Sequence, residues 1–414
     1  MSEFPFIPVA KPWIGEAEAD AARRPILGGW VTQGPEVAAF EEEFSAYVGA
    51  RHACAVSNCT AALHLALRAV GVGPGSEVIT VSHSFIASAN AVRYCGAVPV
   101  FVDVDRTTYN IDPDRIKPAI SSRTRAILCV HQMGMPCDLP AVLKIAEDFS
   151  LPVVEDAACA AGSEILWRDR WERIGKPHGV VACFSFHPRK VITTGDGGML
   201  TTADKALDAQ FRSWRQHSMS ISDATRHRSA RVIFEEYPEL GFNYRMTDIQ
   251  AAVGREQLKR LPAIIERRIE LADRYTRFLS DIPGIIPPRQ PDWGRTNWQS
   301  YCVRIFGDMS QNYVMQYMLE RGVATRRGVM CAHRESAYSK PGSWRCGGLN
   351  CDIIDGSCGH LSESEEAQTN AIILPLYHQM TYCDQDRIIA CFKAAVLAST
   401  SSRHERSDSV LHDA

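Results

Sequence analysis

Hydrophobic positions along the chain follow two alternating patterns. In residues 35–49 and 60–70 apolar side chains recur at helical spacing, and each segment ends at a glycine, Gly49 or Gly71. Short runs of mostly consecutive apolar residues follow, as in strands that are covered on both faces. These runs are Glu77–Val81, Val98–Val104, Ala126–Val130, Pro152–Glu155, Val180–Phe186 and Met199–Thr202. Helical stretches such as Leu139–Phe149 lie between some of them, which predicts an α/β fold with a mainly parallel, doubly wound sheet.

The pattern changes in the last third of the 414 residues, a length that is enough for two domains. The chain is predicted to be helical from Asp248 to about Leu279, and a strand at Tyr301–Ile305 and two further helices follow. We predict a large domain over 1–265, including an N-terminal arm, and a smaller α+β domain over 266–398. Residues 399–414 are polar and without periodicity, and are predicted to form a disordered tail.

Composition excludes several classes of function. Hydrophobic residues make up 45% and charged residues 22% of the chain, as in soluble globular proteins. The net charge of −3 indicates no nucleic-acid or membrane partner. No apolar stretch approaches the ~18 residues that cross a bilayer, and no secretory signal is evident. The 14 cysteines are scattered through apolar segments, so we expect reduced thiols in a cytoplasmic protein.

Polar residues follow three of the predicted strands, at the ends where parallel sheets bind ligands. Asp156 closes an apolar strand, where a carboxylate is costly unless a cation meets it, although a turn or helix-cap aspartate also fits. Lys190 lies beyond the strand that ends at Phe186 and before a glycine-rich turn. When this segment is considered without the other two, a solvated loop lysine is the simpler interpretation. Thr60 lies at a strand-to-helix junction of small residues, which is either a phosphate-binding helix N-terminus or an ordinary cap.

The three features together indicate more than each does alone. A phosphate site, a buried carboxylate and a lysine at neighbouring strand ends are what pyridoxal 5′-phosphate requires. The lysine forms a Schiff base, and the carboxylate keeps the pyridine nitrogen protonated so that the ring acts as an electron sink. The residues therefore predict a pyridoxal-phosphate enzyme.

The sequence resembles the fold-type I, pyridoxal-phosphate-dependent sugar aminotransferases of the DegT/StrS family. The resemblance extends from about Pro8 to Phe392, with matching segments in the same order and spacing. They include GGWVTQGPEVAAFE, SNCTAALHLAL, VITVSHSFIASANAV, VVEDAACAAGS, FSFHPRKVITTGDGGML and LGFNYRMTDIQAA. The resemblance implies the fold-type I architecture, in which a large domain with the parallel sheet carries the cofactor beside a smaller C-terminal α+β domain.

The resemblance also implies roles for individual residues. Lys190 would carry the cofactor and move protons, Asp156 would pair with the ring nitrogen, and Phe85 would stack on the ring. The phosphate would be bound by Thr60, Ala61 and Ser185. Asn243 would reach the cofactor of the partner subunit, so that a homodimer would share its active sites. The sugar pocket would be bordered by Trp30, Thr32 and the segment that includes Arg326 and His333. His187 would either assist at the sugar or have a structural role.

Two cofactor-site positions depart from the family pattern. Cys59 precedes Thr60 where members usually carry glycine. Cys159 occupies the place of a glutamine that contacts the region of the cofactor's phenolic oxygen. Cysteine is a weaker hydrogen-bond partner, so both departures affect cofactor binding, whereas neither replaces the proton-transferring lysine.

An insertion relative to the family pattern contains Cys346, Cys351, Cys358 and His360. Their spacing, C-x4-C-x6-C-x-H, is not a standard zinc spacing, although zinc stays an alternative. We expect an irregular loop with reduced thiols and no metal.

The predicted function is transfer of an amino group from an amino acid, with glutamate as the expected donor, to a keto-sugar. Trp30 and the lysine segment resemble members that act on nucleotide-linked hexoses, commonly at C4 of a 4-keto-6-deoxy sugar, and His187 replaces the glutamine of members that act on free cyclitols. An unlinked keto-sugar or a cyclitol in antibiotic biosynthesis is the alternative substrate. A deoxygenating dehydratase of the same family would carry histidine in place of Lys190. The departures at Cys59 and Cys159 leave open a cofactor-binding regulator without turnover.

Overall fold

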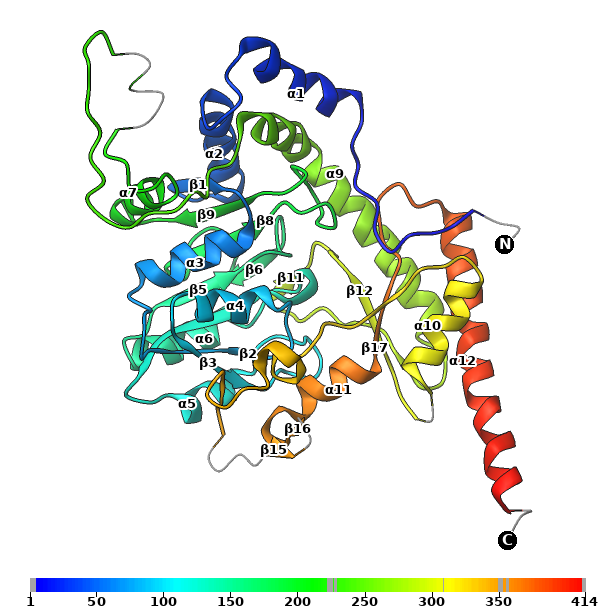
Figure 1. Ribbon diagram of the computed structural model, residues 1–414. Helices are drawn as coiled ribbons and strands as arrows, with labels where there is room; N and C mark the ends of the chain where they lie inside the picture. The colour runs from blue at the N-terminus through cyan, green and yellow to red at the C-terminus, as the bar shows by residue number, and fades with distance from the viewer. Residues whose placement is uncertain are drawn as a thin grey trace.

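The computed structural model describes residues 5–221, 226, 229–307, 309–348, 353–354 and 357–411. Figure 1 shows a large sheet with helices around it, and a smaller group of strands and helices beside it. The long helix α9 (Asp248–Leu279) runs between the two parts.

The large sheet has eight strands and carries the candidate site at one end of its central strands. From edge to edge they are β1 (His52–Val56), β9 (Gly198–Thr202), β8 (Val181–Ser185), β5 (Val153–Asp156), β4 (Thr124–Val130), β2 (Glu77–Val81), β3 (Val98–Val102) and β14 (Arg345–Cys346). β9 runs antiparallel to β1 and β8, and the other neighbours are parallel. The mainly parallel sheet predicted from the apolar runs is confirmed.

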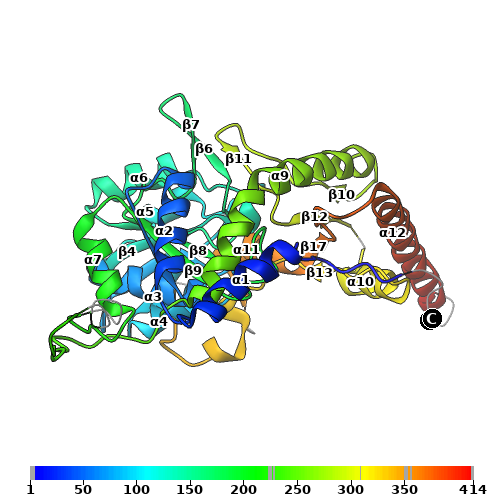
Figure 2. The same cartoon turned by 90° about the horizontal axis from the view of Figure 1, so that it is seen from above.

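Helices cover both faces of this sheet, as Figure 2 shows. Successive residues of β1 alternate between two cores, because strand side chains point to opposite faces. One core includes residues of α2 (Pro35–Val48), α5 (Ile116–Ala119), α6 (Leu139–Asp148) and the first half of α9. The other includes residues of α3 (Cys59–Ala69), α4 (Ala87–Tyr94) and α7 (Lys205–Trp214). The fold is therefore the doubly wound α/β arrangement that the sequence predicts.

The N-terminal segment lies across both parts of the molecule. α1 (Glu16–Gly28) packs along α9, where Glu18 accepts a hydrogen bond of 2.9 Å from the amide of Gln257 and pairs with Arg260 at 2.8 Å. Before α1, Ile7 is buried in the core of the smaller part. The arm therefore connects the two cores from outside the sheet.

The smaller part is α+β, as predicted. Its sheet has the order β10 (Ile285–Ile286), β12 (Tyr301–Ile305), β17 (Ala371–Leu374) and β13 (Arg326–Arg327). α10 (Gln311–Glu320), α11 (Ser362–Asn370), α12 (Tyr382–Leu411) and the second half of α9 accompany it. None of the helices in the described ranges is long and apolar enough to cross a membrane; the cytoplasmic location stays a prediction.

Two features differ from the predicted domain division. The two cores meet within α9, between Ile264 and Leu271, but β14 of the C-terminal part pairs with β3 and extends the large sheet. α12 also continues to Leu411, into the stretch for which the sequence predicts a disordered tail from residue 399. No glycine or proline interrupts residues 382–411. Packed residues such as Phe392 fix the first half of the helix, and adding further residues to an existing helix costs little free energy. Residues 412–414 lie outside the described part, and the domain limits stay a prediction.

The cysteine-containing insertion packs against the edge of the large sheet. Cys346 and Cys358 are buried there beside Phe101, with their Sγ atoms 3.3 Å apart. β15 (Ile353–Ile354) and β16 (Ser357–Cys358) pair antiparallel, His360 is exposed, and Cys351 lies outside the described residues. A separate three-stranded sheet has the order β11 (Gly294–Arg295), β6 (Glu164–Trp167) and β7 (Arg170–Arg173).

Candidate active site

A cavity of about 720 Å³ opens at the carboxyl ends of the central strands. Its walls come from the segments after β2, β4, β5 and β8, from the start of α3, and from residues 326–330 and 373–376 of the smaller part. Nine residues predicted for the site line it: Thr60, Ala61, Phe85, Asp156, Cys159, Ser185, His187, Lys190 and Arg326. Folding therefore brings together residues that are more than 200 positions apart.

Asp156 presents a buried carboxylate to this cavity. It is the last residue of β5 and only 4% exposed. Oδ2 accepts a hydrogen bond of 2.7 Å from Ser88 Oγ, and Oδ1 accepts one of 3.1 Å from the amide of Ala158. Within the described residues no Lys, Arg or His side chain forms an ion pair with it. A buried negative charge with neutral partners alone is a site for a cationic group of a ligand.

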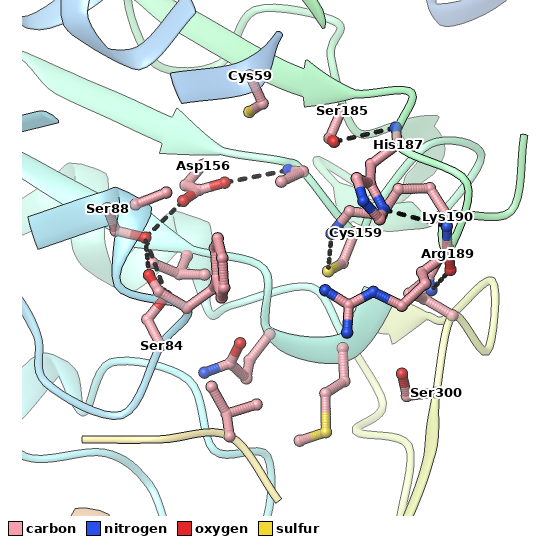
Figure 3. A pocket seen from close by; sticks show the side chains of 18 of the residues that line it. Cys59, Ser84, Ser88, Asp156, Cys159, Ser185, His187, Arg189, Lys190 and Ser300 are labelled. Atoms are coloured by element: carbon pink, nitrogen blue, oxygen red, sulfur yellow. Dashed lines mark hydrogen bonds between the residues drawn. The ribbon is translucent and has the colours of Figure 1, made fainter. Parts of the chain in front are cut away.

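Lys190 reaches the cavity from the turn after β8. The backbone of His187 accepts its amide hydrogen at 2.8 Å, which closes the turn, and Lys190 Nζ lies 3.0 Å from Cys159 Sγ. Burial lowers the pKa of Lys190, but the neighbouring Cys159, together with Cys59 and Asp156, outweighs it and raises that pKa. In Figure 3, Asp156 and Ser88 lie at one side of the cavity and Lys190 with Cys159 at the other.

The N-terminus of α3 forms a further wall of the cavity. The helix begins at Cys59, one residue before the predicted start, and its cap is Asn58, whose side chain accepts the amide of Ala61 at 2.9 Å. β9 passes close beneath, because a Cβ built on Gly198 would lie 2.5 Å from the carbonyl carbon of Asn58. Thr60 and Ser185 complete this end of the cavity, which is positively polarised by the helix dipole.

Phe85 and His187 offer rings at the cavity. Phe85 follows β2 and is 60% exposed although it is a large apolar side chain. Its free face suits stacking on a planar ligand. Partial burial and the nearby charges of Arg189 and Lys190 lower the pKa of His187, so this imidazole is neutral near pH 7.

Four predicted residues do not line the cavity of the single chain described here: Trp30, Thr32, Asn243 and His333. His333 is buried between Ser82 Oγ at 2.6 Å and Glu365 Oε1 at 3.0 Å, and it joins the end of β2 to α11. The side chains of Thr32 and Asn243 are exposed and Trp30 is partly buried. Their roles at a shared site stay predictions.

Several polar residues of the site were not predicted from the sequence, Ser88, Asn297 and Gln299 among them. Ser88 holds Asp156 and could have been found from its place one helical turn after Phe85. Asn297 donates to the backbone oxygens of Cys159 and Ala161, both at 2.9 Å. Gln299 lines the cavity, and its buried Oε1 has no hydrogen-bond partner among the described residues. No local pattern marks Asn297 or Gln299, since both come from a loop of the smaller part.

Comparisons with known proteins agree with this geometry. The sequence profile of the DegT/DnrJ/EryC1/StrS aminotransferase family matches residues 12–393. The spore coat polysaccharide biosynthesis protein SpsC of Bacillus subtilis (strain 168) is 42% identical over 300 residues, which cover 72% of this chain and 76% of SpsC.

Solved structures of similar proteins cover nearly the whole chain. DesV of S. venezuelae, solved in complex with a ketimine intermediate, is 31% identical with a TM-score of 0.81, covering 94% of this chain and 98% of DesV. The PMP form of Spr1654 from Streptococcus pneumoniae is 25% identical with a TM-score of 0.86, covering 96% of this chain and 100% of Spr1654. With its lysine, carboxylate and helix N-terminus around one cavity, the chain belongs to the DegT/DnrJ/EryC1/StrS aminotransferase family.

Proposed function

We propose that this protein uses pyridoxal 5′-phosphate to transfer an amino group from an amino acid, with glutamate as donor, to a nucleotide-linked keto-sugar. One observation carries the proposal. The amine of Lys190 and the buried carboxylate of Asp156 face the same cavity from neighbouring strand ends.

The residues present fit pyridoxal phosphate. Asp156 has no cationic partner among the described residues, and a protonated pyridine nitrogen would supply one. Phe85 would lie against the ring, and Thr60 with the N-terminus of α3 would bind the phosphate. The recorded PMP form of the similar protein Spr1654 supports the same cofactor.

The chain's own residues supply positioning and proton transfer. When bound, pyridoxal phosphate acts as an electron sink for the bonds at the amino-acid carbon. Lys190 would hold the cofactor and would move a proton through Nζ, which lies on the side of the cavity where Cys159 contacts it. Asp156 would pair with the ring nitrogen, and Ser88 orients that carboxylate through its hydrogen bond of 2.7 Å.

Cationic side chains at the cavity support an anionic substrate. Arg189 and Arg326 line it, both are exposed, and neither forms an ion pair within the described residues. Guanidinium groups bind phosphate and carboxylate oxygens in pairs, so they suit the diphosphate of a nucleotide-sugar and the carboxylate of an amino-acid donor. The name of SpsC, a polysaccharide biosynthesis protein, supports a sugar substrate.

We also propose a homodimer with shared active sites. Asn243 and Thr32 are exposed in the single chain. Large apolar side chains stand exposed on the segment that leads to Asn243: Val232, Phe234, Tyr237 and Leu240. A partner subunit that covers this segment would bury them and bring Asn243 toward the neighbouring cofactor.

Two measurements test the function. Glutamate added alone should convert the bound cofactor from its aldehyde to its amine form within one turnover, as followed by absorbance. A panel of nucleotide-linked 4-keto and 3-keto sugars should then yield an amino-sugar identified by mass spectrometry. No conversion by any amino acid would favour a regulator without turnover. Faster turnover of an unlinked cyclitol ketone than of every nucleotide-linked sugar would contradict the proposed substrate.

A further inference from the structure

A second cluster of reactive side chains lies behind the cavity, where the proposed reaction does not use it. Cys129 is near the end of β4, His131 follows that strand, and Cys137 precedes α6. Their side chains have no exposed surface. Cys129 Sγ, Cys137 Sγ and one nitrogen of His131 all lie within 4.8 Å of one another, which is the one such group of three found among the described residues.

The two ring nitrogens of His131 have different partners. Its Nε2 lies 3.1 Å from Oε2 of Glu155, and Oε1 of the same carboxylate accepts the amide of Gly179 at 3.0 Å. Nδ1 accepts the backbone amide of Cys137 at 3.2 Å, so this nitrogen lies on the side of the ring where Cys137 begins. A carboxylate that holds the far nitrogen of a histidine is the usual outer partner of a metal-bound imidazole.

We propose that Cys129, His131 and Cys137 bind a single Zn²⁺ ion. The distances fit after a small adjustment, because the ligand atoms of tetrahedral zinc lie about 3.5–3.8 Å apart for Zn–S bonds of about 2.3 Å and Zn–N bonds of about 2.0 Å. The ion would displace the Cys137 amide from Nδ1, and water would take the fourth position, since three protein ligands leave it open.

Charge favours zinc over a monovalent ion at this depth. Two thiolates and a neutral imidazole balance the charge of Zn²⁺, whereas a monovalent ion would leave one more negative charge uncompensated at this buried site beside Glu155.

The ion would join the end of β4 to the start of α6 across the loop that borders the active site. His131, Gln132 and Met133 line the cavity, which gives an ion a route of entry. Met133 has a positive φ of 56°, an unfavourable conformation for a residue other than glycine, and a bridge across the base of the loop would hold it there. Zinc would thus stabilise one wall of the substrate cavity without contacting the reacting atoms.

The test measures metal directly and needs no substrate, so its outcome is independent of the proposed function. The purified protein with bound cofactor is dialysed against metal-free buffer, titrated with Zn²⁺ and analysed for metal per chain. We expect one equivalent in the wild type and a rise in Tm on binding. Cys129→Ala and Cys137→Ala should each lower the affinity at least 100-fold. Co²⁺ in place of Zn²⁺ should give the visible absorption of tetrahedral thiolate coordination in the wild type alone.

Two controls separate this cluster from other thiols. Cys54→Ala removes an equally buried cysteine of β1, and Cys346→Ser removes one of the insertion; both variants should keep the ion. Thermal unfolding and cofactor absorbance establish that each variant is folded. Absence of binding in the wild type, unchanged binding in Cys137→Ala, loss in Cys346→Ser, or a Cys129–Cys137 disulfide in the purified protein would each overturn the proposal. The wild-type Co²⁺ spectrum decides the matter even where a variant fails to fold.

Discussion

Nζ of Lys190 lies 3.0 Å from Sγ of Cys159, at the wall of the cavity opposite Asp156. The contact joins the turn after β8 to the turn after β5, and Asn297 holds the backbone of Cys159 in place. The thiol therefore occupies a position from which it controls the protonation of the proposed catalytic amine.

Cys159→Ala should move the reactivity of Lys190 to lower pH. In the wild type the neighbouring groups raise the pKa of Lys190 against the effect of burial, so the free amine is scarce below that pKa. Cys159→Ala removes the strongest of the neighbours that raise this pKa, so the pKa falls. The measurement is the rate at which cofactor-free protein captures pyridoxal phosphate at several pH values. Cys59→Ala serves as the control, because Cys59 affects the pKa of Lys190 without a hydrogen bond to its amine. If the capture rate depends on pH in the same way in the wild type and in Cys159→Ala, Cys159 does not set the pKa of Lys190.

Lys190→Ala should bind pyridoxal phosphate without a covalent bond and lose overall transamination. No other residue at the cavity wall offers an amine. Borohydride reduction followed by mass spectrometry should therefore fix the cofactor to the wild type and to Lys205→Ala, which alters an exposed lysine of α7, but not to Lys190→Ala. Cofactor fixed at another lysine with turnover intact would refute the assignment.

Asp156→Asn should lower kcat by about 100-fold or more, which is the scale on which one correctly placed charge or proton-transfer group acts. The amide keeps the shape but not the charge that holds the ring nitrogen protonated. Ser88→Ala, which removes one hydrogen bond of 2.7 Å to the same carboxylate, should have a smaller effect, of about 10-fold, because the carboxylate and its charge remain. Steady-state rates of both variants give the comparison, and near-normal turnover of Asp156→Asn would disprove the role.

Mixing inactive Lys190→Ala and Asn243→Ala subunits should restore activity. In a mixed dimer with shared sites, both lesions fall in one site and the other site is intact. Random exchange of equal amounts should then give about a quarter of the wild-type rate. Subunit exchange is verified by native mass spectrometry, and exchange without recovered activity would argue against shared sites.

Removing the nucleotide from the keto-sugar should lower kcat as well as raise KM. Contacts remote from the reacting carbon, such as Arg189 and Arg326 with a diphosphate, orient the keto group beside Lys190. Arg326→Ala should reduce the difference between the nucleotide-linked and the unlinked substrate. An equal difference in wild type and variant would show that Arg326 does not bind the diphosphate.

Local patterns predicted most elements of the fold well. α2 ends at Gly49, which adopts a positive φ of 80°, and α9 begins with a capping box between Thr247 and Gln250, because these signals act within one helical turn. β2 and β12 have the predicted bounds. β14 was missed because a two-residue edge strand has no periodicity of its own and depends on pairing with β3.

The residues by themselves determined the α/β class, the lysine, the aspartate and the helix N-terminus of the site, since each follows from an adjacent strand or helix. The tertiary structure alone decided which distant groups meet them. Ser88 meets Asp156, Cys159 meets Lys190, and His333 is directed to Ser82 and Glu365 instead of the cavity. Such contacts depend on the order of strands in the sheet and on packing between the two cores, which sequence spacing does not encode.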